Sequence, residues 1–249
     1  MVSVVQIALA TATALATLFS GQADAYAVGS YFRPTGKVVS AVAGNTAKYR
    51  RSPCPALNAL ANHGYIARNG QNISLTELTD AIMSVFNVGA DLAAALTSQS
   101  PGFPLNLDVL STHNLIEHDA SLVHSDAHFG NPPDKVNSTL VADLLQRADA
   151  KGFIGLEAVG KTRKDRLAAC KRDNPECSFT PFQTRTALAE AGALICLMGA
   201  KRNNDSISVA HARSFLVHEK LPSDFLKSET QVTLVDLQTY SAKIAAFTV

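Results

Sequence analysis

Helix start signals recur along this chain, whereas the alternation of apolar and polar residues that is typical of strands is scarce. Ser74 and Glu77 form a capping box, and apolar residues at helical spacing follow as far as Leu96. Further caps at Ser138 or Thr139, at Thr180-Pro181 and at Ser206 or Ser208 predict three more helices, ending near positions 150, 199 and 221. With no internal repeat and no long linker, the 249 residues are expected to form one all-α domain after any leader is removed.

The first 25 residues have the pattern of a secretory signal peptide. An apolar run from Val4 to Phe19 precedes Ala23-Asp24-Ala25, which fits the small-x-small cleavage site of such signals. The run is short for a membrane span, and no second run follows it. We therefore expect a signal peptide over 1–25, a folded domain over 26–249, secretion to the extracellular space and no membrane span. Glycosylation sequons that suit a secreted chain begin at Asn72, Asn137 and Asn204.

Four cysteines remain after this signal, and one of them has no obvious partner. Cys170 and Cys177 lie close together in a polar stretch, so a small disulfide loop is expected in an oxidising compartment. Cys196 lies in an apolar run and is interpreted as a buried, inert thiol. Cys54 is left over. The formal net charge of +1 provides no basic footprint, so no nucleic-acid partner is expected.

The sequence around Cys54 places its sulfur at the start of a helix. Pro55 is preset for a first helical position, the range 56–61 follows as helix, and Gly64 is a natural left-handed stop. Unpaired amides and the helix dipole at this end are expected to lower the thiol pKa and favour a thiolate, which is a ligand for ferric haem iron. A structural cysteine at a helix cap would show the same pattern, so that alternative stays open.

A second polar cluster runs from Glu117 to Ser121. If the stretch is helical, Glu117 and Ser121 share one face and, with a backbone carbonyl, offer oxygen ligands to a hard cation such as magnesium. His118 is a candidate proton relay. A polar helix start is the alternative. A weaker zinc hypothesis uses the spacing of His124, Asp126 and His128. The remaining histidines are interpreted as structural or surface residues: His63, His113, His211 and His218.

Glu190 is an isolated acid in a helix that is otherwise becoming apolar. Burial of a carboxylate is costly unless it has a role, so the residue is a candidate catalytic group. The alternative is a charge on a solvated stripe. Its helical face is shared with Gln183, Thr186, Ala187, Ala193 and Leu194.

Taken together, these segments resemble the haem-thiolate peroxidases, the family of chloroperoxidase and the unspecific peroxygenases. The resemblance rests on Pro-Cys-Pro followed by Ala-Leu-Asn-Ala-Leu-Ala-Asn-His-Gly-Tyr, and on Glu-His-Asp-Ala-Ser about sixty residues later. It continues through Phe86-Asn87, the range 126–130, Ser178-Phe179, Glu190 and the range 212–215. It thus covers nearly all of the chain after the signal, and implies a single helical haem-binding domain.

The resemblance also implies roles for individual residues. Cys54 is expected to be the axial ligand of haem b, and Glu190 the distal acid–base group. Glu117, Ser121 and the backbone carbonyl of His118 are expected to bind a divalent cation, magnesium, that also takes a haem propionate. Longer members have glycine where this chain has His118, and arginine where it has Gln183. His118 is therefore expected to replace the arginine as the charge-stabilising group, with Asp119 orienting its ring.

The expected activity is hydrogen-peroxide-dependent oxygen transfer to small apolar or aromatic organic substrates by a monomer or homodimer. A haloperoxidase like chloroperoxidase and a dedicated secondary-metabolite peroxidase are alternatives on the same fold, and a non-catalytic secreted haem-binding protein is a remote one. Several small side chains stand where longer members place phenylalanines, which predicts a wide channel for bulky substrates. The expected channel residues are Val88, Ile116, Thr186 and Ala193.

Overall fold

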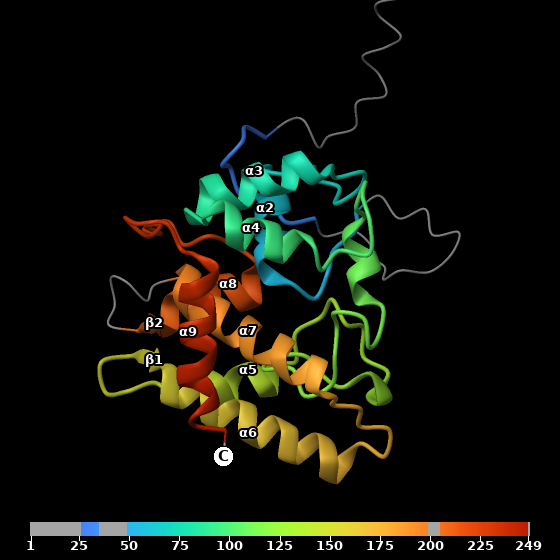
Figure 1. Cartoon of the computed structure of the whole chain (residues 1–249), viewed down its shortest axis with the longest axis vertical. Helices are drawn as coiled ribbons and strands as arrows, with labels where there is room; N and C mark the ends of the chain where they lie inside the picture. Colours follow the sequence, from blue (N-terminus) through green and yellow to red (C-terminus); the bar gives the residue numbers. More distant parts are fainter. Residues whose placement is uncertain (1–25, 35–48, 199–204, 249) are drawn as a thin grey trace, which may run out of the picture.

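The computed structural model describes residues 26–34, 49–198 and 205–248, and these are mostly helical, as Figure 1 shows. The predicted all-α class is therefore confirmed. The predicted signal peptide and Asn204 lie outside the described residues. The helices are α2 (Pro55–Asn62), α3 (Leu75–Phe86), α4 (Ala90–Thr97), α5 (Ser138–Leu145), α6 (Leu156–Asp173), α7 (Pro181–Met198), α8 (Val209–His218) and α9 (Leu234–Ala245). Two 3-10 turns, η3 (Leu107–Ser111) and η4 (Ala127–Phe129), and two strands, β1 (Phe153–Gly155) and β2 (Ser206–Ser208), complete the elements.

Helix α2 begins and ends where the sequence predicts. Pro55 occupies its first position and Cys54 is the N-cap residue. Gly64, just past the C-cap, has a φ of +72°, and a Cβ built there would lie 2.7 Å from Nη2 of Arg68. Glycine is therefore needed at this stop for both conformation and space.

The single helix predicted from the Ser74 cap to Leu96 is wrong, because the chain forms two helices there. The capping box at Ser74 is present, but α3 ends at Phe86, and its C-cap residue Asn87 is left-handed with a φ of 53°. The amides around the break bond to a distant segment instead: Gly89 N donates to the Val232 carbonyl at 2.9 Å, and Val232 N donates to the Asn87 carbonyl at 2.9 Å. Tertiary bonds thus replace the helical bonds at the break.

The start of α5 also differs in detail from the prediction. Its N-cap is Asn137 rather than Ser138 or Thr139, since the Asn137 side chain accepts hydrogen bonds from the Thr139 and Leu140 amides. The helix ends at Leu145, earlier than expected, because the chain turns there toward β1. By contrast, α7 begins at Pro181 and α8 is capped by Ser208, as predicted.

Helices α6 and α9 were not predicted, and they complete the lower part of the molecule. α9 begins with a capping box formed by Thr233 and Asp236. It packs extensively on α7 and also on α6, where a Cβ added to Gly160 would lie 2.5 Å from Cβ of Phe247. β1 and β2 pair antiparallel, with Ile154 opposite Ile207.

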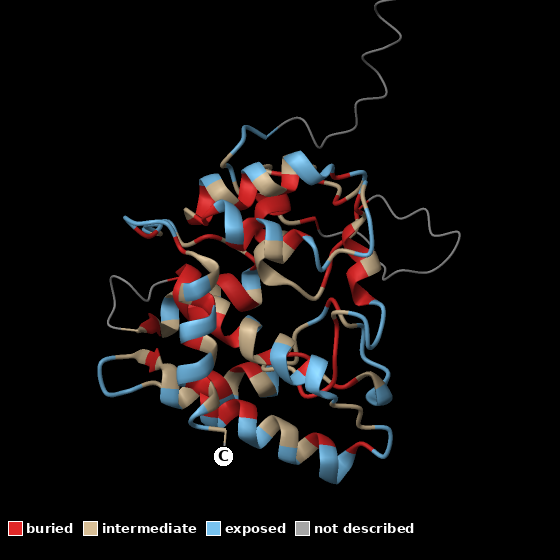
Figure 2. Ribbon diagram, viewed as in Figure 1, coloured by how far each residue is buried: buried red, intermediate tan, exposed pale blue. Residues whose placement is uncertain are grey.

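Buried residues lie on the facing sides of these helices, as Figure 2 shows. Ile195 of α7 and Ile244 of α9 are fully buried, and Leu60 of α2 is fully buried on the other side of the molecule. None of the described helices has the length and apolar character that a bilayer crossing requires. The elements α2–α4 and α7–α9 thus form two helical groups, and the candidate site lies between them.

Candidate active site

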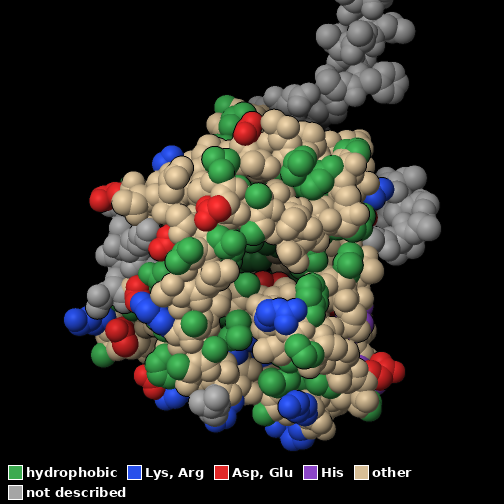
Figure 3. Space-filling view, in the orientation of Figure 1, with side chains coloured by type: hydrophobic (Ala, Val, Ile, Leu, Met, Phe, Trp, Pro, Cys, Tyr) green, Lys and Arg blue, Asp and Glu red, His purple; other side chains and the backbone are tan. Residues whose placement is uncertain are grey.

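A cavity of about 640 Å³ lies between the two helical groups and opens as the hollow visible in Figure 3. Most of its wall is apolar, supplied by leucines, alanines and phenylalanines. Its chemically active side chains are Cys54, Glu117, His118, Ser121, His124, Arg163, Arg185 and Glu190. The structure therefore brings together on one cavity the cysteine, the cation-site side chains and the acid–base pair that the sequence singled out.

Cys54 reaches this cavity from the N-terminus of α2. Its side chain occupies the cap position but makes no capping hydrogen bond there. The expected lowering of its pKa is wrong, however. Burial raises the pKa of the Cys54 thiol to about 11, because loss of solvent outweighs the lowering effect of the nearby Leu57 and Ala56 amides.

His118 and Glu190 form a hydrogen-bonded pair across the cavity wall. His118 Nδ1 lies 2.6 Å from the backbone oxygen of Asp119, which can only accept, so this nitrogen carries a hydrogen. His118 Nε2 lies 3.1 Å from Oε2 of Glu190. Burial lowers the pKa of His118, but the hydrogen bond to Glu190 and its charge more than offset this, so the pKa is raised overall. One proton is thus shared between the ring and the carboxylate.

Glu190 is less enclosed than its apolar neighbours in the sequence suggested. Its side chain is 52% exposed, whereas that of His118 is 2% exposed. The reason is that its face of α7 lines the cavity instead of packing against another helix. The carboxylate is therefore accessible to a small molecule while its partner is fixed.

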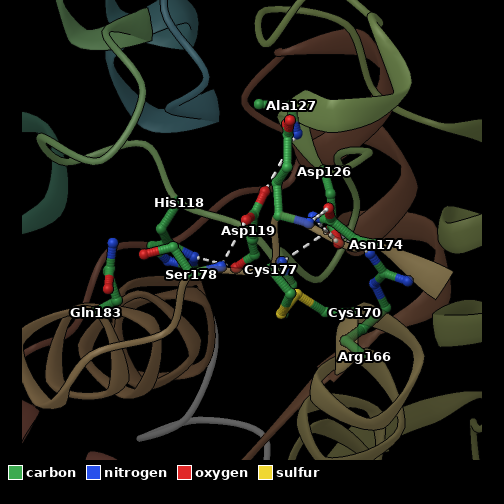
Figure 4. The surroundings of a disulfide bond; sticks show 12 residues. His118, Asp119, Asp126, Ala127, Arg166, Cys170, Asn174, Cys177, Ser178 and Gln183 are labelled. Carbon is green, nitrogen blue, oxygen red and sulfur yellow. Dashed lines mark hydrogen bonds and ion pairs between the residues drawn. A yellow bond between two sulfur atoms is a disulfide. The ribbon is translucent and has the colours of Figure 1, made fainter. Parts of the chain in front are cut away.

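Asp119 contacts the His118 ring as predicted, but through its backbone oxygen and not through its carboxylate. As Figure 4 shows, the carboxylate points toward the disulfide loop. Its Oδ1 accepts a bond from Ala127 N at 3.2 Å, and its Oδ2 accepts one from Ser178 N at 3.1 Å. Of the Asp119 polar groups, the backbone carbonyl is the one that contacts the ring.

Cys170, buried at the end of α6, is joined to Cys177 by a disulfide with a Cα–Cα distance of 5.6 Å. Ser178, whose amide binds Asp119, follows Cys177 directly. The covalent loop therefore fixes the donor that holds the Asp119 carboxylate. Cys196 is buried in α7, and among the described residues Cys54 and Cys196 are the cysteines outside a disulfide.

The expected cation ligands lie on a loop and not on a helix, so the argument from a shared helical face is wrong, although both side chains still line the cavity. Glu117 Oε2 lies 2.7 Å from Nδ1 of His113, and Ser121 Oγ lies 3.2 Å from Nδ1 of His124. Burial raises the pKa of Glu117, and the bond to His113 partly offsets this rise. Burial lowers the pKa of His124 to about 4.

The zinc hypothesis is wrong, because its three side chains bind different partners. His124 lies against Ser121, Asp126 pairs with Arg166 at 3.0 Å, and His128 pairs with the exposed Glu176. Among the described residues, one group with metal-ligand spacing is Asp119 with Cys170 and Cys177. The sulfurs of that group are joined in the disulfide and so cannot bind a metal.

Comparison with known proteins decides the family. The family model described as "Peroxidase, family 2" matches residues 31–230. The chain belongs to this peroxidase family. It is therefore an oxidoreductase that acts on peroxide, with hydrogen peroxide and organic molecules as its substrates.

Its relatives within the family carry several names. It is 30% identical over 207 residues to the aromatic peroxygenase of Coprinellus radians, covering 72% of this chain and 78% of the relative. It is 30% identical over 205 residues to the aromatic peroxygenase of Cyclocybe aegerita, covering 72% of this chain and 55% of the relative. A match to the chloroperoxidase of Leptoxyphium fumago is 40% identical over 88 residues and covers 30% of this chain and 24% of the relative. Apart from the first, the chain spans about half or less of these peroxidases.

Three of the four expected channel residues line the cavity of this peroxidase. These are Ile116, Thr186 and Ala193. Val88 does not line it: it is 1% exposed, and it forms a β-bridge with Val232 at the break between α3 and α4. The absence of a phenylalanine at Val88 therefore does not widen the channel.

The sequons differ in how accessible their side-chain amides are. Asn72 is exposed. Asn137 is half-buried, and its side-chain nitrogen donates to Ser125 Oγ at 2.9 Å while its oxygen caps α5. Attachment of a glycan is thus compatible with the observed structure at Asn72 and would disturb an existing bond at Asn137.

One residue near the site, Arg163, was not predicted from the sequence. Arg163 of α6 is 4% exposed, donates to the backbone oxygen of Ala120, and lies 5.5 Å from the ring centroid of Phe179. Phe179 in turn meets His118 edge-on, with 5.7 Å between ring centroids. Phe179 was noted as part of the resemblance, but Arg163 carried no signal because α6 itself was not predicted.

Proposed function

We propose that this peroxidase is a secreted peroxygenase, in which a cysteine-ligated haem b and hydrogen peroxide oxygenate small apolar or aromatic molecules. The His118–Glu190 pair carries the proposal, because it places a shared proton on the apolar cavity that also contains the Cys54 sulfur. The two aromatic peroxygenases among its relatives favour oxygen transfer over simple electron transfer.

The cavity has the features that a haem requires. Its volume of about 640 Å³ lies within the range of cofactor pockets, and its walls are mostly apolar. The Cys54 sulfur would be a suitable iron ligand, since it lines this cavity from the start of α2. Bound there, haem b would supply the redox chemistry and the positive charge that keeps a buried thiol ionised. Glu117, Ser121 and the His118 carbonyl would hold the divalent cation, which we propose to be magnesium.

The protein groups contribute proton transfer and exclusion of water. Oε2 of Glu190 accepts a proton from one oxygen of hydrogen peroxide and returns it to the other, which leaves as water. Nε2 of His118 orients this carboxylate and stabilises the charge that develops on it. Overall, a substrate C–H bond and the peroxide O–O bond break, and an alcohol and water form. The substrate carbon is oxidised and the peroxide is reduced.

Product analysis with peroxide tests this proposal most directly. The purified holoenzyme is given hydrogen peroxide and a panel of alkane, aromatic, fatty acid and chloride acceptors. We expect oxygenated organic products, and we expect Glu190→Gln to slow the peroxide step by about a hundredfold or more while haem stays bound. Glu157→Gln, an exposed glutamate of α6, is the matched control and should behave as wild type. Normal peroxygenation by Glu190→Gln would remove this residue from the mechanism.

Haem ligation has its own test. Thiolate ligation predicts a Soret band of the ferrous carbonyl adduct that is shifted far to the red, and Cys54→Ala should abolish this band or lose the haem. A band at the position typical of histidine ligation would refute ligation by Cys54. Folded protein that stays colourless when supplied with porphyrin and iron would refute the haem itself.

Halide oxidation is the second candidate, because an 88-residue segment is 40% identical to a chloroperoxidase, whereas the longer matches to the two peroxygenases are 30% identical. The same acid–base pair would serve both reactions, so the panel distinguishes them: chlorinated products without oxygenated ones would favour a haloperoxidase. Turnover of a single metabolite would favour a dedicated biosynthetic peroxidase. A relative from Dothistroma septosporum is named as a peroxidase of dothistromin biosynthesis. Secretion and the monomeric or homodimeric state stay predictions.

A further inference from the structure

One arginine on the cavity wall has no partner among the residues that the structure describes. Arg185 is exposed on α7 and lines the cavity, and no described residue gives it a hydrogen-bond acceptor or an ion pair. The other basic side chain of the lining, Arg163, is buried, donates to the Ala120 carbonyl and packs on Phe179. Figure 3 shows lysine or arginine atoms beside the hollow on this face. Arg185 is thus the cation of the described cavity wall that is free to bind a ligand.

The surroundings of Arg185 are those of an amphipathic binding site. Phe182, one turn earlier on α7, lines the cavity and is 42% exposed. Leu96 and Leu234 line the same cavity from α4 and α9. An anionic group could therefore meet the guanidinium while an attached apolar chain remains on the apolar wall. A planar guanidinium binds a carboxylate through two parallel hydrogen bonds, which makes the carboxylate the best-matched anion.

The acidic groups of the cavity lie elsewhere on its wall. Glu190 follows Arg185 by five residues, which is about 7.5 Å along the helix axis. Glu117 lies on the loop that also carries His118, and Figure 3 shows acidic atoms inside the hollow. Like charges disfavour a carboxylate near Glu190, and the opposite charge favours it at Arg185. The charges of the cavity thus orient an anionic amphiphile with its carboxylate toward the arginine and its tail toward the acid–base pair.

We propose that Arg185 is a specificity residue that binds the carboxylate of an aliphatic monocarboxylic acid. The apolar tail then lies in the cavity beside Glu190, so oxidation falls on carbons remote from the carboxylate. This inference rests on the proposed peroxygenase function for its chemical step. In that step a tail C–H bond and hydrogen peroxide give a tail alcohol and water.

Binding without peroxide tests the carboxylate site separately from turnover. Calorimetry on the purified holoenzyme compares dodecanoate with dodecan-1-ol, which has the same chain but no charge. We expect Arg185→Gln to weaken dodecanoate binding about tenfold or more, with a much smaller effect on dodecan-1-ol. Arg185→Lys keeps the positive charge but loses the paired donors of the guanidinium, so its affinity for dodecanoate should lie between those of wild type and Arg185→Gln. Arg172→Gln, which alters an exposed arginine of α6 outside the cavity, should change neither.

The outcomes separate the two proposals. Equal weakening of the acid and the alcohol, or unchanged dodecanoate binding in Arg185→Gln, overturns the role of Arg185. Charge-dependent binding without any oxygenated product supports the carboxylate site and overturns the peroxygenase function. When dodecanoate is turned over, wild type should hydroxylate the distal part of the chain, and Arg185→Gln should spread the products toward the carboxylate. An identical product distribution in both proteins would also refute the inference.

Discussion

Replacing the Asp119 carboxylate should cost stability and leave the His118 ring in place. The carboxylate is 1% exposed and accepts two backbone hydrogen bonds, from Ala127 and Ser178. Hydrogen bonds to a charged group contribute about 1.5–3 kcal/mol each, and Asp119→Ala leaves both amides without an acceptor. We therefore expect the free energy of unfolding to fall by about 3–5 kcal/mol. Asp119→Asn keeps one acceptor oxygen and should lose about 2 kcal/mol.

Denaturant unfolding measures these losses, and stopped-flow mixing with peroxide measures the site. Asp143→Asn, an exposed acid on α5, is the control and should change stability by less than about 0.5 kcal/mol. Because the backbone oxygen of Asp119 holds His118, the peroxide step of folded Asp119→Asn should stay close to wild type. An unchanged stability combined with a peroxide step as slow as that of His118→Ala would refute this assignment. The carboxylate would then act on the ring.

Three further perturbations test other parts of the fold, and for each the measurement is the free energy of unfolding. Removal of the disulfide by replacing Cys170 and Cys177 with serine opens a loop of sequence separation 7, and should cost about 2.5 kcal/mol; no measurable loss would contradict this. Gly160→Ala should cost about 1–3 kcal/mol by forcing α6 away from α9, whereas Gly155→Ala, with no atom within 4 Å of its Cβ position, should cost far less. His63 donates from Nδ1 to the Gly29 carbonyl and accepts at Nε2 from the Leu221 amide, and burial lowers its pKa. As pH falls below about 6.5, His63 therefore takes up a proton in the unfolded chain before it does so in the folded one, and the free energy of unfolding should decline. His63→Asn should make this decline smaller.

Local sequence signals predicted where helices begin better than where they end. The caps at Ser74, Thr180 and Ser208 rest on contacts within three or four residues, which the sequence contains in full. The end of α3 depends on bonds between residues 87–89 and 228–232, which no local pattern encodes. The start of α9 carries a capping box at Thr233 that the sequence analysis did not use.

The identity of the site residues was more predictable than their contacts. The motifs placed Cys54, His118 and Glu190 together, and the structure shows all three on one cavity. The thiol pKa was mispredicted because helix position is local whereas burial depends on the whole fold. The sequence likewise did not indicate which part of Asp119 contacts the ring: the backbone oxygen does so, whereas the carboxylate binds amides 8 and 59 residues away.

The position of Ser178 directly after Cys177 has a practical consequence for anyone producing this enzyme. In a host compartment that keeps thiols reduced, the chain would contain every site residue but would lack the Cys170–Cys177 disulfide. The Ser178 amide, which binds the Asp119 carboxylate, would then not be fixed by a covalent loop. Yield of soluble protein would then overstate the fraction of competent molecules. Counting free thiols in each preparation, before any rate is compared, would separate poor maturation from poor chemistry.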